Sequence, residues 1–313
     1  MISDLWGQPK LVESTRPAMG TQFRIACHGE PEIASKAMEE AFRCVSELEK
    51  VLSDYSPESE VTHLNQSLGN FVASPALFDC LQRSLHLAQR TDGAFDFTLG
   101  HFTQLWRRSR RKGVLPDDSV IVERRQKTGY QFVQLNPQIR SVTLLREGMQ
   151  LDFGGIGKGY AADQALKVLR QHGISSAIVA GSGDYAIGDP MPGESGWKVT
   201  LRAFDGDLFT VRLSNCGVST SGDVHQFAEI DGVRYSHIVD PKTGLGLTSF
   251  VAASVIADDA ATSDALATAA CVMGASNAMK WHKESRLAKL RIVSKHGDSI
   301  QIQTTENWPH EKL

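Results

Sequence analysis

The stretch LDFGGIGKGYAADQALKVL, residues 151 to 169, joins an apolar, strand-like start to an amphipathic helix through a loop rich in glycine. The five residues from Gly154 to Lys158 contain three glycines and one lysine. Glycine allows positive φ and lets a ligand come close to the backbone N–H groups. A helix that begins at Tyr160 would direct its unpaired N–H groups and its positive dipole end toward the same place. The loop therefore predicts either an anion site, most simply for a phosphate, or a tight strand-to-helix turn packed against the core.

The two standard nucleotide-binding signatures do not fit this loop. A P-loop requires a serine or threonine after its lysine, and here Lys158 is followed by Gly159. A dinucleotide fingerprint requires G-x-G-x-x-G between a strand and a helix of a parallel unit. Neither residues 154–159 nor the second glycine-rich stretch at 181–188 has that spacing. Both standard signatures are therefore excluded.

The composition is that of an ordinary globular protein of 313 residues, with 41% hydrophobic and 22% charged residues. A net charge of -3 argues against a general nucleic-acid-binding protein, because such proteins usually carry a basic excess. The five cysteines are scattered and form no CxxC pair, which favours free thiols in a reducing compartment. The segment from Met1 to Phe23 has no apolar run long enough for a signal peptide or a membrane span. We therefore expect a cytoplasmic protein.

Outside the glycine loop, the hydrophobic pattern predicts helices interleaved with short strands and hairpins. The expected helices span 31–53, 74–93, 160–171 and 258–274, the strands 21–27, 175–184 and 197–222, and the hairpins 141–155 and 290–305. The basic run from Arg107 to Asp118 predicts a surface excursion. Because no regular strand-helix repeat occurs, we predict an α+β fold with a largely antiparallel sheet core and flanking helices. No linker divides the chain, which predicts one domain over residues 1–313.

Asp264 and Thr268 lie four residues apart in the last predicted helix and therefore share one face. The rest of that helix is small or apolar, so this face should be buried, and an unpaired buried carboxylate is costly. A Mg²⁺ ion bound by carboxylate, hydroxyl, carbonyl and phosphate oxygens would satisfy both side chains. The alternative is that Asp264 caps a neighbouring loop and Thr268 hydrogen-bonds to its own helix.

Several other positions are candidates for chemistry or for binding. His237 precedes a Pro-Lys-Thr-Gly turn and could act as a general base or have a structural role. Tyr55 could stack on a planar ligand or be an ordinary surface tyrosine. Asp96 could contact a ligand or form a turn bond. The run Arg107 to Lys112 is either a solvated face or a guide for a polyanionic ligand or an acidic partner.

Taken in order, these segments resemble one family, the FAD:protein FMN transferases, or ApbE-like flavin transferases. The resemblance covers nearly the whole chain and rests on seven blocks in family order: RPAMGTQF (16–23), LSDYSPESEVTHLN (52–65), GAFDFTLG (93–100), LDFGGIGKGYAAD (151–163), STSGDVHQF (219–227), YSHIVDPKTG (235–244) and SDALATAACVMG (263–274). It implies an ApbE-like fold. Relatives often carry Gly-Gly-Asn or Gly-Gly-Asp where this chain has Gly181-Ser-Gly-Asp184, so contacts near that turn are expected to differ.

The resemblance also implies a role for each matching residue. The Mg²⁺ ligands would be the carbonyl oxygen of Gly155 and the side chains of Asp264 and Thr268. His237 would lie at the reacting centre as the base that activates a hydroxyl nucleophile. The residues implied to bind FAD are Met19, Tyr55, Ala94, Phe95, Asp96, Asp152, Lys158 and Ile238.

The implied reaction splits the diphosphate of FAD, which is a substrate here, and joins FMN to a threonine or serine hydroxyl of an acceptor flavoprotein, with release of AMP. Bound Mg²⁺ would stabilise the charge that develops, with Lys158 as a second cation. Two alternatives stay open: a pyrophosphatase that hydrolyses FAD to FMN and AMP, and a non-catalytic flavin-binding protein. The signal and acylated cysteine of many family members are not seen in this sequence, which favours a soluble acceptor.

Overall fold

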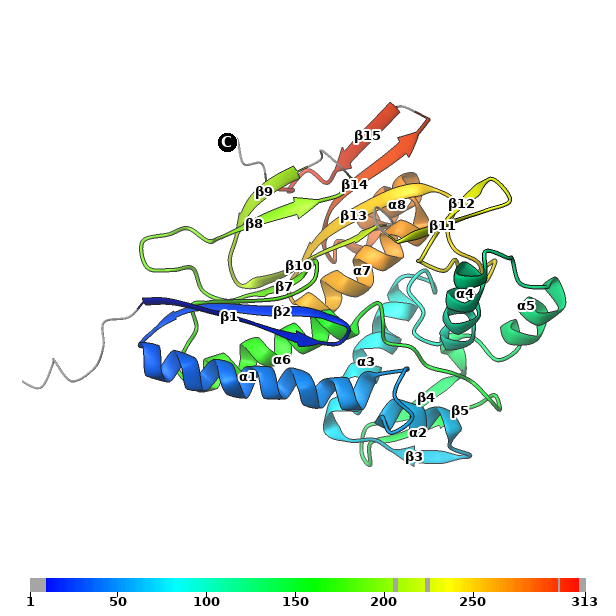
Figure 1. The fold of residues 1–313 in the computed structure, drawn as a ribbon, viewed down its shortest axis with the longest axis horizontal. Helices are drawn as coiled ribbons and strands as arrows, with labels where there is room; N and C mark the ends of the chain where they lie inside the picture. Colours follow the sequence, from blue (N-terminus) through cyan, green and yellow to red (C-terminus); the bar gives the residue numbers. More distant parts are fainter. Residues whose placement is uncertain (1–9, 205–207, 223–225, 298, 310–313) are drawn as a thin grey trace, which may run out of the picture.

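A computed structural model describes residues 10–204, 208–222, 226–297 and 299–309. Its centre is an eight-stranded sheet in which each neighbouring pair of strands is antiparallel (Figure 1). In sheet order, the strands are β1 (Lys10–Ala18), β2 (Thr21–Gly29), β6 (Ala177–Gly181), β7 (Asp184–Ile187), β10 (Cys216–Gly222), β13 (Phe250–Ala257), β14 (Lys289–His296) and β15 (Ser299–Thr304). The predicted α+β class with a largely antiparallel sheet is therefore confirmed.

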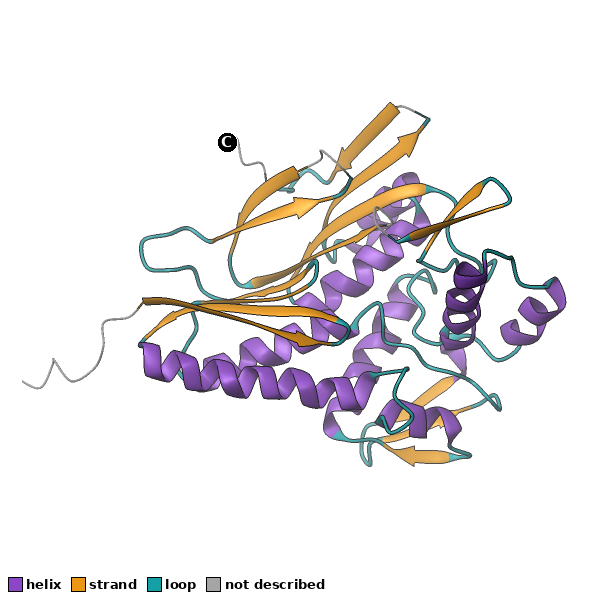
Figure 2. Ribbon diagram, in the orientation of Figure 1, coloured by secondary structure: helices purple, strands orange, loops and turns teal. Residues whose placement is uncertain are grey.

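Helices cover one face of this sheet, as the separate strand and helix layers of Figure 2 show. The three that pack side by side are α1 (Pro31–Leu52), α6 (Gly157–Gln171) and α7 (Ala260–Met273). Two more, α3 (Pro75–Arg90) and α8 (Ala275–Ser285), pack against α7. Helix α1 buries a stripe at helical spacing, which anchors this layer: Ala34, Ala37, Ala41, Val45, Leu48 and Leu52.

A hairpin of β8 (Trp197–Arg202) and β9 (Leu208–Leu213) packs on the opposite face. Its inward positions alternate with exposed ones, as expected for a half-buried strand. The buried side chains Trp197, Val199 and Leu201 form a second core with residues of β2, β7, β10 and β13. The sheet is thus contacted by helix α7 on one face and is covered by the β8–β9 hairpin on the other face.

Smaller elements surround the end of the sheet at which α4 lies in Figure 1. They are α2 (Glu60–Gln66), β3 (Asn70–Val72), α4 (Gly100–Lys112), α5 (Asp118–Arg125), the short 3-10 helix η1 (Tyr130–Phe132), β4 (Val133–Asn136), β5 (Ser141–Leu144), β11 (Phe227–Ile230) and β12 (Val233–Ser236). Phe102 and Trp106 of α4 pack with Ile230 and Val239 in one apolar cluster. Helix α4 is therefore held beside the segment that carries His237.

Most predicted elements are confirmed. The helices at 31–53, 74–93 and 258–274 are α1, α3 and α7, and the hairpin at 290–305 is β14 with β15. The strand at 21–27 is β2, and 197–222 contains β8, β9 and β10. The strand at 175–184 is β6, and the last residue of this range, Asp184, begins β7, which pairs with β6 as a hairpin. Strand β1 was not predicted.

The predicted hairpin at 141–155 is wrong. Strand β5 pairs with β3 and β4, whereas Gln150 bridges to Leu99 and the N–H of Asp152 donates to the carbonyl of Phe97 at 2.8 Å. The apolar side chains at 149, 151 and 153 are buried, so the chain leaves the Gly148 turn toward the core instead of folding back on β5.

Two further expectations need correction. Helix α6 begins at Gly157 instead of Tyr160, since the N–H of Tyr160 already donates to the carbonyl of Ile156 at 2.9 Å. Lys158 therefore lies in the first helical turn. The basic run from Arg107 to Lys112 is not a surface excursion but the last part of α4.

The described residues contain no helix of the length and apolarity that a membrane span requires. Residues 223–225 of the STSGDVHQF block lie outside the described part of the chain, as does the beginning of the chain, residues 1–9.

Candidate functional site

The first turn of α6 meets α7 and β7 at a cluster of three charged side chains. The ammonium Nζ of Lys158 lies 3.0 Å from Oδ2 of Asp184 and 3.7 Å from Oδ2 of Asp264. The N–H of Gly159 donates to the same oxygen of Asp264 at 3.1 Å. Segments about 100 residues apart in the sequence therefore converge on one carboxylate, as expected from the glycine loop and the late helix.

The glycines of this loop serve close packing. A Cβ on Gly159 would lie 2.1 Å from the carbonyl oxygen of Ala260, and one on Gly155 would lie 3.3 Å from Oγ1 of Thr268. Neither glycine has a positive φ, nor do Gly154 and Gly157. The positive φ that glycine allows is therefore not used here, and Gly159 is required because α6 and α7 touch at this point, which agrees with the alternative of a tight turn packed against the core.

The charges of this cluster do not balance. Two carboxylates face one ammonium. Burial opposes the charged form of Lys158, but the combined attraction of the carboxylates outweighs it, raises the pKa of Lys158 and keeps this side chain charged. Burial and the charge of Asp184 raise the pKa of Asp264 to about 7, although Lys158 opposes this. A buried carboxylate with an unbalanced charge is stabilised by a further cation.

The neighbouring oxygen donors fit a hard divalent cation. Thr268 lies one helical turn beyond Asp264, with its Oγ1 3.3 Å from Oγ of Ser221, and it faces Gly155, where a Cβ would lie 3.3 Å from the same oxygen. No group of three or more His, Cys, Asp or Glu suited to a metal occurs among the described residues. A metal here would therefore rely on one carboxylate with hydroxyl, carbonyl and substrate oxygens, a donor set that suits Mg²⁺.

Two adjoining cavities share His237 and Gln226 in their walls. The first, here called the Tyr55 cavity, has a volume of about 260 Å³, and nine predicted site residues line it: Tyr55, Ala94, Phe95, Asp96, Asp152, Gly155, His237, Ile238 and Thr268. The second, the Lys158 cavity, has a volume of about 370 Å³ and includes Lys158, Asp184 and Asp264. Among the predicted residues only Met19 lines neither cavity.

His237 is held at the boundary of the cavities by its neighbours. Its backbone N–H donates to the carbonyl of Gln226 at 2.9 Å, and the indole N–H of Trp106 donates to the carbonyl of Ser236 at 2.8 Å. Burial, followed by the charge of Arg110, lowers the pKa of His237 to about 4. Its Nδ1 is buried without a hydrogen-bond partner in the described residues. The imidazole is therefore neutral at pH 7, as a base must be.

Arg107 joins three side chains at the rim of the Tyr55 cavity. Its Nη2 lies 2.6 Å from Oδ2 of Asp54 and 2.9 Å from Oδ2 of Asp152. Asp152 also accepts from Oγ1 of Thr103 at 2.6 Å. The guanidinium lies 4.4 Å from the ring centre of Tyr55, whose other face is open because the residue is 76% exposed. A planar ligand can therefore stack on Tyr55.

The remaining predicted residues have local partners. Asp96 accepts from the N–H of Thr98 at 2.8 Å and from its hydroxyl at 2.7 Å, and from the N–H of Tyr130 at 3.2 Å, so it forms turn bonds while lining the cavity. Met19 lies in the turn between β1 and β2, and its Cε is 3.7 Å from where a Cβ of Gly157 would be. Met19 thus supports the first turn of α6.

The cavities also contain residues that were not predicted as site residues: Asp54, Thr103, Arg107, Arg110, Asp184, Ser221 and Gln226. One signal could have identified three of them, since Thr103, Arg107 and Arg110 repeat at helical spacing and share a face of α4. The basic run is therefore not a solvated face throughout.

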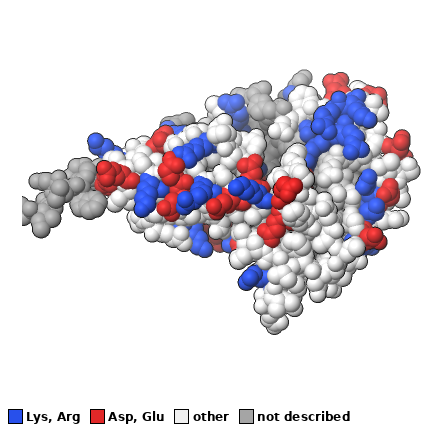
Figure 3. All heavy atoms as spheres, turned by 60° about the horizontal axis from the view of Figure 1, so that its bottom comes forward, with Lys and Arg blue, Asp and Glu red and all other residues white. Residues whose placement is uncertain are grey.

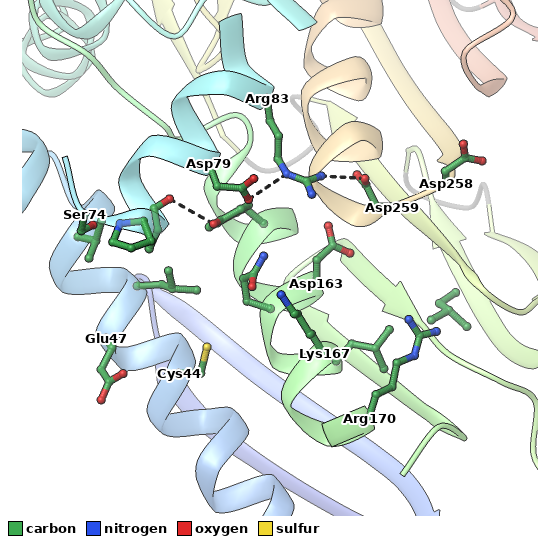
Figure 4. Close-up of a pocket in the computed structure, with 18 of the residues that line it drawn as sticks. Cys44, Glu47, Ser74, Asp79, Arg83, Asp163, Lys167, Arg170, Asp258 and Asp259 are labelled. Carbon is green, nitrogen blue, oxygen red and sulfur yellow. Dashed lines mark hydrogen bonds and ion pairs between the residues drawn. The ribbon is translucent and has the colours of Figure 1, made fainter. Parts of the chain in front are cut away.

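A larger cavity, about 1060 Å³, lies elsewhere, lined by α1, α3, α6 and the N-cap of α7 (Figure 4). Several of its charged groups have structural partners. Arg83 bridges Asp79 and Asp259 at 3.1 and 2.9 Å, and Asp163 accepts from the first two N–H groups of α7. These contacts hold the N-terminus of α7, so this cavity supports the helix layer.

Comparisons with known proteins point to one family. The ApbE family model matches residues 19–291. The chain is 32% identical over 297 residues to the FAD:protein FMN transferase of Treponema pallidum (strain Nichols), covering 87% of this chain and 82% of that protein. It is 30% identical over 299 residues to the FAD:protein FMN transferase of Escherichia coli (strain K12), covering 90% of this chain and 84% of that protein.

Solved structures share the fold. The apo form of the Pseudomonas stutzeri flavinyl transferase ApbE superposes with a TM-score of 0.85 at 27% identity, covering 97% of this chain and 96% of that one. The flavin transferase ApbE of Vibrio cholerae gives a TM-score of 0.85 at 25% identity, covering 95% of this chain and 98% of that one. With a family match over most of its length and the same fold as these structures, the chain belongs to the ApbE family.

Proposed function

We propose that this protein transfers FMN from FAD to a hydroxyl group of a target protein and releases AMP. The observation that carries the proposal is the arrangement at His237, which lines both the Tyr55 cavity and the Lys158 cavity. A dinucleotide that occupies both cavities has its diphosphate at their boundary, beside a neutral imidazole. The named relatives support this reaction, since they are FAD:protein FMN transferases.

In the proposed reaction, the hydroxyl oxygen of a threonine or serine attacks the phosphorus of the FMN half. The bond from this phosphorus to the bridging oxygen breaks, and that oxygen leaves with AMP. His237 takes the proton of the attacking hydroxyl on a ring nitrogen, which its neutral state at pH 7 allows. The bonds that the Trp106 indole and the Gln226 carbonyl make around His237 hold this histidine in position.

The residues that would hold Mg²⁺ are Gly155, Asp264 and Thr268, which the oxygen chemistry of the site supports. When bound, this cation supplies positive charge that stabilises phosphoryl oxygens. Lys158 and the N–H of Gly159 keep the Asp264 carboxylate in place.

The Tyr55 cavity would take the flavin. The open face of Tyr55 and the apolar side chains of Phe95 and Ile238 suit its ring system, with Ala94 beside them. Asp96 and Asp152 would shape the cavity through the local bonds they make. Met19 would contribute indirectly, by packing against the first turn of α6 at Gly157.

Transfer is tested by incubating the protein with FAD, Mg²⁺ and a candidate acceptor flavoprotein. The expected result is an acceptor whose mass rises by one FMN less one water, with one AMP released for each FMN attached. His237→Gln should abolish both products, whereas His86→Gln, at an exposed histidine outside the cavities, should retain them.

Two outcomes would contradict this function. AMP release that is equally fast without an acceptor, and without labelled protein, would identify a pyrophosphatase. Tight FAD binding without any turnover would identify a flavin-binding protein.

We also propose that residues 1–313 form one domain, which is supported by a family match over residues 19–291. The cytoplasmic location stays a prediction.

A further inference from the structure

Four Lys and Arg side chains line the two cavities, and two of them are already neutralised by the protein. Lys158 lies between Asp184 and Asp264, and Arg107 lies between Asp54 and Asp152. A cation held between two carboxylates has little remaining attraction for a third anion. Lys158, which the sequence suggested as the second cation of the reaction, is therefore poorly placed for that role.

Arg202, on β8, is exposed and lines only the Lys158 cavity, so the remaining cation of the Tyr55 cavity is Arg110. It lies one turn beyond Arg107 on α4 and lines the Tyr55 cavity. Within the described residues Arg110 makes no ion pair, and its Nε is buried without a hydrogen-bond partner. Nδ1 of His237, which lines the same cavity, is also buried and unpartnered. Two buried polar groups without partners on one cavity wall indicate a ligand that satisfies them.

We propose that Arg110 binds the phosphoryl group of the FMN half of FAD beside His237 and is the protein cation that stabilises this group during transfer. The inference rests on the proposed function, because it assigns one of that site's substrate contacts. A guanidinium offers parallel N–H donors that match two phosphoryl oxygens, and the buried Nε–H of Arg110 has no partner among the described residues. The negative charge that develops on these oxygens is then stabilised by a cation that forms no ion pair with a carboxylate of the described residues.

The two faces of α4 provide an internal control. Figure 3 shows a basic patch where the end of this helix lies, in contrast to the mixed charges along α1. Arg108, Arg111 and Lys112 are exposed, whereas Arg107 and Arg110 turn inward to the cavity. A general electrostatic effect of the basic helix would thus be shared by Arg108, but a direct phosphoryl contact would not.

The test compares the binding of FMN and riboflavin, which differ by one phosphoryl group, through the quenching of flavin fluorescence. We expect the wild-type protein to bind FMN more tightly than riboflavin by on the order of 10- to 100-fold, the value of a hydrogen bond to a charged group. Arg110→Gln should lose this preference and keep the riboflavin affinity, which also shows that the cavity is folded. Arg110→Lys should retain part of it, and Arg108→Gln all of it.

Several results would overturn the proposal. One is an Arg110→Gln protein that still prefers FMN by the wild-type factor, and another is a wild-type protein with no preference. A variant that loses affinity for AMP but not for FMN would place the guanidinium on the other phosphate. Binding does not require transfer, so a protein with the expected FMN preference that labels no acceptor would refute the proposed function and leave the Arg110 site standing.

Discussion

The contact between α6 and α7 at Gly159 allows a sharp prediction. A Cβ on Gly159 would lie 2.1 Å from the carbonyl oxygen of Ala260, 2.6 Å from its carbon and 2.9 Å from Cβ of Asp264. The obstacle is backbone, which no rotamer change can remove. Asp163 also holds the N–H of Ala260 at 2.9 Å. Gly159→Ala must therefore push the two helices apart by more than about 1 Å to reach an ordinary contact distance.

The change in the free energy of unfolding of Gly159→Ala follows from two opposing contributions. Replacing glycine by alanine in a helix stabilises it by about 1 kcal/mol. Overpacking costs about 1–3 kcal/mol, and a rigid backbone neighbour places this case at the upper end. The net loss of unfolding free energy is about 2 kcal/mol, which lowers Tm by about 3 °C in a chain of this size.

The effect on activity should be larger than the effect on stability. The displacement stretches the 3.1 Å bond from the N–H of Gly159 to Asp264 and the 3.7 Å contact from Lys158 to the same carboxylate. A misplacement of about 1 Å at a reacting centre can cost on the order of 100-fold in rate. We therefore expect kcat/KM for FMN transfer to fall by about that factor.

Gly157→Ala is the matched control in the same helical turn. A Cβ at this position would meet Cε of Met19 and Cβ of Phe153 at 3.7 Å, which is ordinary contact. Its Tm and transfer rate should stay close to those of the wild type, with a stability change within about 1 kcal/mol. Thermal unfolding and labelling of an acceptor by mass spectrometry measure both quantities. If Gly159→Ala behaved like Gly157→Ala, the idea that this contact positions Asp264 would be refuted.

Three other predictions concern the base, the metal ligand and the cap of α7. Because burial and Arg110 lower the pKa of His237 to about 4, kcat/KM measured at Mg²⁺ concentrations that saturate the Asp264 site should rise as the pH passes about 4 and stay level near 6.5, where an ordinary histidine titrates. In Arg110→Gln the rise should move to higher pH, and an inflection near 6.5 that persists in the wild type at saturating Mg²⁺ would contradict this assignment of the base. Asp264→Asn should raise the Mg²⁺ concentration for half-maximal rate by at least about tenfold, since loss of even an outer partner costs that much; an unchanged Mg²⁺ titration would exclude Asp264 as a ligand. Asp163→Ala removes the acceptor of two N–H groups of α7 and should lower the free energy of unfolding, measured in urea, by about 1–2 kcal/mol. The control is Lys167→Ala, an exposed position on the same helix as Asp163, which should change the free energy of unfolding by less than about 0.5 kcal/mol. Equal effects of the two substitutions would refute the capping role.

The local hydrophobic pattern was enough to predict the helices and strands whose buried residues recur at a regular spacing. The apolar stripe of α1, the small residues of α7 and the alternation in β8 each predict one element, because helix and strand expose their faces with different periods. The hairpin at 141–155 failed because both of its halves look like strands, while their partners are set by contacts far away in the chain. Pairing between distant strands is not encoded within a local window.

The sequence alone determined the fold class, the family resemblance and the set of chemically active side chains, since these depend on residue type, order and spacing. Only the tertiary structure decided which of these charges are compensated. Asp184 and Asp264 come from β7 and α7, and the packing of these elements around the start of α6 places both against Lys158. Arg107 is likewise neutralised by Asp54 and Asp152, whereas Arg110, in the same basic run, makes no ion pair within the described part of the chain. A charge acquires its partner through folding in three dimensions, so the position of each arginine within the run, and not its residue type, determines its role.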